Sequence, residues 1–166
     1  QLVAQNVAGI AIAANDADAL QPALTEAMDA GIKVISLDSA VNKDSRQTHI
    51  QQADPEKIGR GLIQAAYEMV DGNGGIAVLS ATAQATNQNL WIEWMKKELE
   101  ENPEKYANTP LVKVAYGDDD PTKSTSETQA LLTDSSIKVI IAPTTVGMLA
   151  AGKVLQDKQS DVKLTG

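Results

Sequence analysis

The chain has 166 residues, of which 43% are hydrophobic and 3% are aromatic, and its formal net charge is -8 at pH 7. This length and apolar content are enough for a hydrophobic core and exclude a disordered chain. The acidic balance, with no cluster of Lys and Arg, argues against binding to nucleic acid or to an anionic membrane surface. The absence of cysteine excludes disulfides and thiolate chemistry.

No apolar run approaches the roughly 20 residues that a membrane-spanning helix needs. Both ends interrupt a pattern: "QLVAQNV" is typical of the last turns of a helix, and "DVKLTG" stops as soon as a strand has formed. We therefore expect the chain to be part of a longer protein.

The predicted elements alternate between strands and helices from the start of the chain. "VAGIAIAA" predicts a buried strand, and the apolar spacing of Asp16 to Ala30 predicts a helix that Gly31 ends. "IKVISLDS" is the next predicted strand, and "THIQQ" is a weaker one. Asp54 and Pro55 then have the character of an N-cap and a first helical residue.

The same alternation continues to the end of the chain. "DGNGG" ends the helix that begins at Pro55, and "IAVLSA" predicts a third strong strand. The remaining predicted elements are, in order, a helix from Gln88 to Glu101, the strand "LVKVAY", a helix from Thr122 to Leu132, the strand "IKVIIA", a helix from Val146 to Gln156 and the strand "VKLTG". Apolar strands joined by amphipathic helices predict an α/β fold, a doubly wound and mostly parallel sheet with helices on both faces.

The least regular stretch is "AVNKDSRQTHIQQ", residues 40–52, so we expect a boundary between lobes near Gln47 to Ile50. Residues 59–61, "GRG", lie inside a helical pattern, and this predicts close packing at that point of the helix.

No motif for catalysis, phosphate binding or metal binding stands out. "GNGG" precedes a strand, whereas a phosphate-binding loop follows one. His49 has no Cys or carboxylate at ligand spacing, so we interpret it as an ordinary polar residue. "GDDDP" lacks the pattern of a calcium loop and is interpreted as a solvated cap of the following helix. We expect no cofactor and no metal.

Ligands of open parallel sheets bind beyond the carboxyl ends of the strands. The residues that follow the predicted strands are rich in amides, hydroxyls and carboxylates: Asn15, Asp16, Asp38, Ser39, 82–88, 117–120, Pro143, Thr144 and Thr145. Such groups suit a neutral polyol, which donates and accepts hydrogen bonds at once. Trp91 or Trp94 could cover the apolar face of a sugar ring, although a helical Trp is more often part of the core.

A second explanation exists for several of these residues. Asn15, Asp16, Asn87 and Thr145 all stand near predicted helix starts, where N-capping alone would account for them. Asp38 ends a strand with no helix to cap, which favours a ligand-binding role.

Five segments carry a family resemblance: "GIAIAANDADALQPALTEAMDAGIKVISLDS", "QADPEKIGRGLIQAA", "ATNQNLWIEWMK", "YGDDDPTKSTSETQALL" and "KVIIAPTTVGMLAAGKVLQ". Together they make the chain resemble the sugar-binding proteins of ABC importers, in the rhamnose-binding and autoinducer-2-binding branch of the type I periplasmic binding fold. The resemblance implies a two-lobed protein that closes on a sugar. Residues 1–48 would be part of the N-terminal lobe, and residues 49–166 nearly the whole C-terminal lobe.

The resemblance also implies site residues. In autoinducer-2 binders an Asp corresponds to Asp38, an Asp-Gln pair to Asn87 and Gln88, and a Pro-x-Ala to Pro143 and Thr145. Asn at 87 cannot supply the anionic acceptor of an Asp, so autoinducer-2 is a poorer fit than rhamnose or a related deoxyhexose.

The predicted ligand-binding residues are therefore Asp38, Asn87, Gln88, Asn15, Pro143 and Thr145. The expected function is that of a receptor, without catalysis, that delivers a monosaccharide, L-rhamnose first, to a membrane permease. Its expected location is the periplasm, or a lipid-anchored extracytoplasmic position. The alternatives are an autoinducer-2 receptor, the effector domain of a sugar-responsive repressor, and an α/β enzyme; the last would need acid and base groups that the sequence does not offer.

Overall fold

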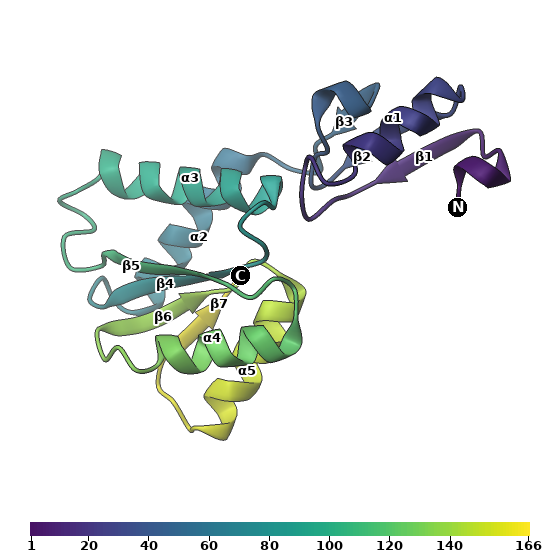
Figure 1. Ribbon diagram of the computed structural model, residues 1–166. Coiled ribbons are helices and arrows are strands. Elements are labelled where there is room, and N and C mark those ends of the chain that lie inside the picture. Colours follow the sequence, from purple (N-terminus) through teal and green to yellow (C-terminus); the bar gives the residue numbers. More distant parts are fainter. The chain divides into compact units, whose positions relative to one another are not determined.

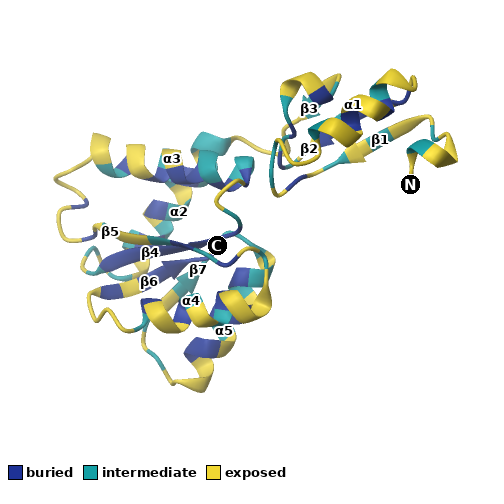
Figure 2. Cartoon of the chain, viewed as in Figure 1, coloured by how far each residue is buried: buried dark blue, intermediate teal, exposed yellow.

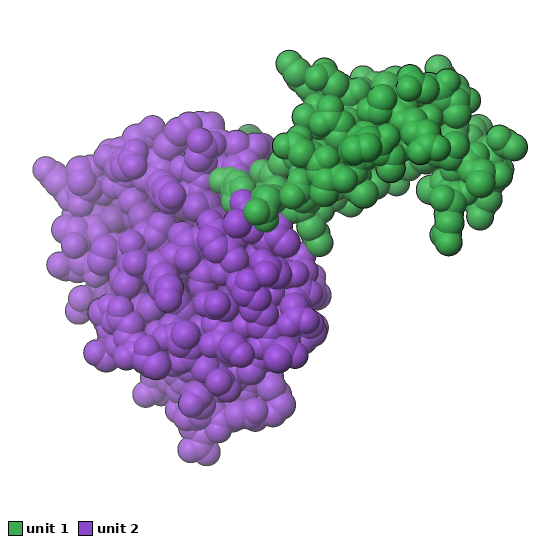
Figure 3. Space-filling view, viewed as in Figure 1, with its two compact units in different colours: residues 1–54, 84–89 green, residues 55–83, 90–166 purple.

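The computed structural model describes all 166 residues and contains two compact units (Figures 1 and 3). The first unit comprises residues 1–54 and 84–89, and the second comprises residues 55–83 and 90–166. The first division between the units falls after Asp54, because Thr48–Ile50 forms a strand of the first unit's sheet. The lobe boundary expected near Gln47 to Ile50 stays a prediction. The assignment of residues 1–48 and 49–166 to two lobes of a longer protein stays a prediction.

The first unit is built on a three-stranded parallel sheet (Figure 1). Its strands, in spatial order, are β1 (Gly9–Ile12), β2 (Lys33–Leu37) and β3 (Thr48–Ile50), and α1 (Gln21–Asp29) joins the first two. Short 3-10 helices lie at Val3–Gln5 and Lys43–Ser45. Side chains of α1, including Leu24 and Ala27, pack on one face of the sheet around Val34. The register partners Leu37 and Ile50 point to the other face and stay 40% and 53% exposed, so this sheet is covered on one face only.

The second unit is a four-stranded parallel sheet between two layers of helices (Figure 1). Its spatial strand order is β5 (Leu111–Tyr116), β4 (Gly75–Ser80), β6 (Ile137–Ile141) and β7 (Lys163–Thr165). Its helices are α2 (Pro55–Met69), α3 (Thr86–Glu101), α4 (Pro121–Leu131) and α5 (Thr145–Asp157), of which α3 begins in the first unit. This arrangement confirms the predicted doubly wound α/β fold.

Strand β4 lies in the middle of this unit, and all of its residues are buried (Figure 2). Its successive side chains point alternately to the two faces of the sheet. Ile76 and Val78 pack with residues of α2 and α3, whereas Ala77 and Leu79 pack with residues of α4 and α5. A strand that is buried on both faces is mostly apolar, which explains the run "IAVL" that precedes Ser80.

The predicted helices exist, but one begins well away from its expected position. The helix predicted from Asp16 begins at Gln21, because the Asp16 carboxylate accepts hydrogen bonds from the backbone N–H groups of Asp18 and Ala19 and forms a turn instead. The helix predicted from Gln88 begins at Thr86. The "GDDDP" loop does cap α4, since the Asp120 carboxylate accepts from the Lys123 N–H at 2.7 Å.

The predicted close packing at "GRG" is confirmed for Gly59 only. A Cβ atom at Gly59 would lie 2.5 Å from the Trp91 carbonyl oxygen and 2.5 Å from the Trp94 Cβ, so α2 and α3 approach each other here at backbone distance. A Cβ atom at Gly61 would meet nothing within 4 Å, so the expectation was wrong for that residue.

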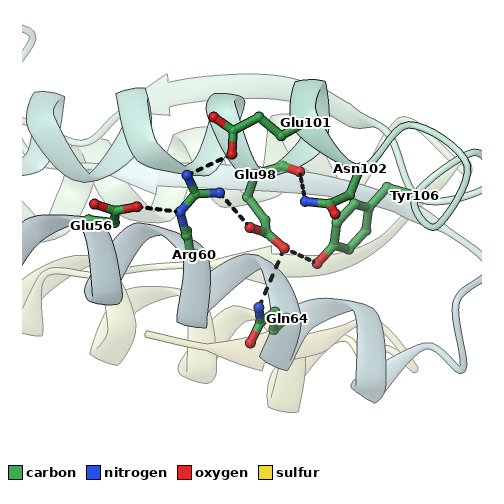
Figure 4. Close-up of polar contacts among 7 residues, drawn as sticks. All are labelled: Glu56, Arg60, Gln64, Glu98, Glu101, Asn102 and Tyr106. Atoms are coloured by element: carbon green, nitrogen blue, oxygen red, sulfur yellow. Dashed lines mark hydrogen bonds and ion pairs between the residues drawn. The ribbon is translucent and has the colours of Figure 1, made fainter.

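A buried carboxylate also ties α2 to α3 (Figure 4). Glu98 of α3 is only 4% exposed and accepts hydrogen bonds from Arg60 at 2.8 Å, from the Tyr106 hydroxyl at 2.8 Å and from Gln64 at 3.4 Å. Burial raises the pKa of the Glu98 carboxyl, but these hydrogen bonds and the Arg60 charge outweigh burial and bring the pKa below its ordinary value of 4.5.

The other guanidinium nitrogens of Arg60 also contact carboxylates. Its guanidinium contacts Glu56 at 2.9 Å and Glu101 at 2.7 Å (Figure 4). The hydrogen bonds to Glu98, Glu101 and Glu56 raise the pKa of Arg60. One guanidinium thus connects three carboxylates on two helices, and its planar set of five donors suits that task better than an ammonium group would.

We expect Tyr106→Phe to lower the free energy of unfolding by about 1 to 2 kcal/mol at neutral pH, because one donor to a buried carboxylate is lost while the ring remains. The lost hydrogen bond is one that lowers the Glu98 pKa. The stabilisation that this hydrogen bond gives is fully present at a pH above 4.5, the ordinary pKa of the Glu98 carboxyl. It is lost as the pH falls through the lower pKa that Glu98 has in the folded protein. Urea unfolding in neutral and in strongly acidic buffer measures both values, and the loss should shrink in acid.

The matched control is Tyr67→Phe. The Tyr67 ring meets the Tyr106 ring edge-on, with 5.3 Å between centroids, but the Tyr67 hydroxyl makes no hydrogen bond. Its removal should leave the free energy of unfolding nearly unchanged. If Tyr106→Phe lowers the free energy of unfolding equally in neutral and acidic buffer, the stabilisation by the Tyr106 hydroxyl does not come from its hydrogen bond to the Glu98 carboxylate.

Candidate ligand-binding site

The carboxyl ends of β1, β2 and β3 lie at one edge of the first unit's sheet, because the three strands are parallel. The segments that follow them are joined by hydrogen bonds. The Ala14 N–H donates to the Ser39 carbonyl at 3.4 Å, which links the ends of β1 and β2. The Gln52 amide donates to the Asp38 carboxylate at 2.5 Å, which links the ends of β2 and β3.

Asp38 is the centre of this edge. Its backbone has a φ of 57°, in the left-handed region, which Asp and Asn enter more readily than other residues that carry a side chain. Its Oδ1 accepts from Gln52 and also from the Asn87 amide at 3.1 Å. Its Oδ2 makes no hydrogen bond. One oxygen of the carboxylate is thus held by the protein, and the other can accept from a ligand.

Asn87 uses both ends of its amide. Its Oδ1 accepts from the Gln88 N–H at 2.7 Å, so its Nδ2 is the atom that faces Asp38. The orientation of the Asn87 amide follows from chemistry, because its nitrogen can donate to the Asp38 carboxylate and its oxygen cannot. Gln88 itself is 4% exposed. The structure therefore joins Asp38, Asn87 and the Gln88 backbone by hydrogen bonds within the first unit.

Thr86 anchors the start of α3 beside the end of β2. Its hydroxyl accepts from the Ala40 N–H at 2.8 Å, donates to the Ala40 carbonyl at 3.3 Å and lies 3.1 Å from the Ser39 hydroxyl. These bonds join segments 46 and 47 residues apart in sequence. Because Asn87 follows Thr86 directly, the anchor also determines where the Asn87 amide lies.

N-capping does not account for the other predicted residues. Asn15 is exposed and lies after β1, but α1 begins only at Gln21. Asn87 lies inside α3, whose first residue is Thr86. Thr145 is the first residue of α5, and the N-cap position belongs to Thr144, whose side chain makes no capping bond. None of Asn15, Asn87 and Thr145 therefore occupies an N-cap position, although the Asn87 Oδ1 does accept from a first-turn N–H of α3, that of Gln88.

The second unit has its own polar edge. The strand order reverses between β4 and β6, and the crevice of a doubly wound sheet lies at such a switch point. Pro143 and Thr145 follow β6 at this point. The Thr144 hydroxyl between them donates to the Asp119 carboxylate at 2.5 Å, and Asp119 belongs to the loop that follows β5. The ends of β5 and β6, which flank β4, are thus connected.

The surroundings of both Trp side chains and of His49 are as follows. Trp91 is 8% exposed and belongs to the core of the second unit, while Trp94 lies under two cations, with Lys97 4.1 Å and Arg60 5.1 Å from the ring centroid. His49 pairs with the Ser36 hydroxyl and with Gln51, as an ordinary polar residue would. No three His, Cys, Asp or Glu side chains gather as a metal site would require. None of the helices combines the length and the apolar character of a membrane span.

One residue of the first unit's edge was not predicted, Gln52, whereas Thr86 lies within the predicted segment 82–88. Gln52 could have been found by the same rule, since it follows the weak strand "THIQQ". Gln52 was missed because β3 is only three residues long and carries little apolar signal.

The parallel sheets and the doubly wound topology define an α/β fold of the type I periplasmic-binding kind. Residues 1–166 match the periplasmic binding protein domain family, and the chain belongs to that family.

Among solved structures, an ABC transporter solute-binding protein from Clostridium phytofermentas with bound L-rhamnose is 51% identical, with a TM-score of 0.92 over 99% of this chain and 51% of that one. LsrB from Clostridium saccharobutylicum in complex with AI-2 is 26% identical, with a TM-score of 0.86 over 99% and 54%. A solute-binding protein from Burkholderia graminis in complex with D-arabinose is 26% identical, with a TM-score of 0.83 over 98% and 57%.

The chain thus spans about half the length of these solved structures, 51% to 57% of each. The resemblance to sugar-binding proteins of ABC importers, in the branch that includes rhamnose and autoinducer-2 binders, is confirmed. The roles of the individual site residues stay predictions.

Thr86→Val should loosen the segment after β2, because the methyl group that replaces the hydroxyl can neither accept from the Ala40 N–H nor donate to its carbonyl. We expect amide exchange of Ala40 to accelerate about fivefold to tenfold, which corresponds to about 1 kcal/mol. Hydrogen exchange followed by NMR measures it. Thr125→Val is the control, since that hydroxyl donates to the Pro121 carbonyl in α4. Unchanged exchange at Ala40 in Thr86→Val would refute the anchoring role.

Proposed function

We propose that this protein is a solute receptor of an ABC sugar importer, that it binds a monosaccharide, L-rhamnose before others, and that it delivers the sugar to a membrane permease. The observation that carries the proposal is the 51% identity, across 99% of the chain, with a solute-binding protein that holds L-rhamnose. An extracytoplasmic location, the periplasm or a lipid-anchored position, accords with the family to which the chain belongs.

The chemistry of the first unit's edge supports a neutral polyol as ligand. The carboxylate of Asp38 offers a strong acceptor for a hydroxyl proton, while amides such as Asn87 and Gln88 can donate and accept. A sugar that covers one of these groups and leaves it without a partner loses roughly 1 to 3 kcal/mol, which is the physical basis of selection between sugars.

Binding without catalysis is part of the proposal. The family is one of solute-binding proteins. At the edge of the first unit, the carboxylate of Asp38 already accepts from two amides, and no His, Lys or hydroxyl nucleophile is paired with it. Such a carboxylate orients hydroxyl groups rather than transferring their protons.

Autoinducer-2 is the second candidate ligand, since LsrB, at 26% identity, is in complex with it. The autoinducer-2 pattern has Asp where this chain has Asn87. Here that position donates to Asp38 at 3.1 Å, which an Asp carboxylate could not do. The departure therefore changes the hydrogen bonding of Asp38 itself, and it favours a ligand other than autoinducer-2.

Thermal unfolding of the full-length protein that contains residues 1–166, measured with a panel of monosaccharides and autoinducer-2, tests the proposal. We expect L-rhamnose to raise the midpoint by several degrees, because a ligand at about a hundred times its Kd stabilises the folded protein by about 2.7 kcal/mol. A shift with autoinducer-2 and none with rhamnose would make the ligand assignment wrong. The absence of a shift with every compound would count against a sugar receptor.

A further inference from the structure

Gln52 is a contact of Asp38 that neither a motif nor the family pattern used above assigns. It follows β3, and its Nε2 donates to the Asp38 Oδ1 at 2.5 Å. The Asn87 Nδ2 donates to the same oxygen at 3.1 Å. The two amides lie 14 and 49 residues from Asp38 in sequence, and all three residues belong to the first unit. Two neutral donors thus converge on one carboxylate oxygen.

This convergence fixes the orientation of the carboxylate. Rotation about the Cβ–Cγ bond of Asp38 would break both amide bonds, because both end on Oδ1. The left-handed backbone, with φ of 57°, sets where the side chain leaves the chain. The Oδ2 atom, which makes no hydrogen bond, is therefore held in one direction as a free acceptor.

The charge state of the partners matters as much as their position. Gln and Asn are neutral, so they bind Oδ1 without neutralising the negative charge that Oδ2 presents to a ligand. A Lys or Arg in either place would form an ion pair and weaken Oδ2 as an acceptor. A carboxylate in either place would have no proton to donate and would repel Asp38.

We infer that Gln52 and Asn87 form an amide pair that positions Asp38, so that Oδ2 accepts a hydroxyl proton of the bound sugar, and that Gln52 is thereby a specificity-determining positioning residue. This inference rests on the proposed function. It also defines the ligand group that Oδ2 takes: a neutral hydroxyl donor binds there, and the carboxylate of a sugar acid is repelled.

The competing explanation is that Gln52 only stabilises the chain after β3. The side chain of Gln52 is exposed, so a hydrogen bond there adds little to the free energy of unfolding. A stabilising role would change the unfolding midpoint of the ligand-free protein and would leave the relative affinities for different sugars alone. A positioning role does the reverse, and the two can be separated.

The experiment compares Gln52→Ala with Gln51→Ala in the full-length protein, by calorimetric titration with L-rhamnose and with L-rhamnonate, its acid analogue. Gln51 is the matched control, because its side chain is of the same type and adjacent but bonds to His49. We expect Gln52→Ala to weaken rhamnose binding about fivefold to twentyfold and to reduce discrimination against the acid, and Gln51→Ala to change Kd less than about twofold. The ligand-free unfolding midpoint should stay near that of the unchanged protein in both variants.

A double-mutant cycle with Asp38→Asn then shows whether Gln52 acts through Asp38. Asn tolerates the left-handed backbone but carries no charge. In the Asp38→Asn background, Gln52→Ala should cost much less affinity than it does alone, since the carboxylate that it positions is gone. A full additional loss in that background would overturn the inference.

The remaining outcomes are distinguishable. Equal rhamnose Kd values for Gln52→Ala and Gln51→Ala, in a protein that does bind rhamnose, would overturn the amide pair and leave the proposed function standing. If the unchanged protein binds no sugar of the panel, the proposed function fails, and the inference fails with it. Loss of affinity together with a large fall in the ligand-free unfolding midpoint would show a structural role and would also overturn the inference.

Discussion

The parallel pairing of the strands is the constraint from which the rest of the molecule follows. Because every strand in a parallel sheet points the same way, every segment that leaves a strand leaves at the same edge. Both units thereby gather the residues that follow their strands at one edge: Asp38 and Gln52 in the first, Asp119 and Thr144 in the second. Polar side chains that are scattered along the sequence become neighbours for this reason, and no local motif is needed to assemble them.

The same constraint decides where polar groups can be tolerated. Parallel strands need helical crossovers, and in the second unit these cover both faces of the sheet, so β4 has no room for a charge. The one buried charge between the helices that cover it, Glu98, is matched by Arg60, Tyr106 and Gln64. An unmatched carboxylate there would be costly. The Asp38 Oδ2 atom, which has no hydrogen bond, lies instead at a strand end, where solvent or a ligand can supply the partner.

Sequence periodicity predicted the fold well because each element of the second unit has a one-sided or fully apolar pattern. It was less successful where a polar side chain rearranges the backbone. Asp16 stands where a helix start is expected, yet its carboxylate binds two N–H groups and delays α1 to Gln21. The sequence predicted that the residues of the candidate site lie at strand ends, but it did not predict the hydrogen bonds between them. Gln52 and Asn87 meet at Asp38 only through the register of β3 and the anchoring of Thr86, and neither can be derived from residue spacing.

The position of Asn87 shows why the identity of a side chain matters more than its polarity. Its oxygen accepts from the Gln88 N–H and its nitrogen donates to Asp38, so the two ends of the amide have opposite tasks. An Asp in the same place could perform the first task but not the second, and would leave two carboxylates facing each other. Such a pair is stable only when a ligand places a donor between them, or when one carboxylate is protonated. An amide removes that requirement, and Asp38 is left as the single carboxylate of this hydrogen-bonded group, with its orientation set by two neutral donors.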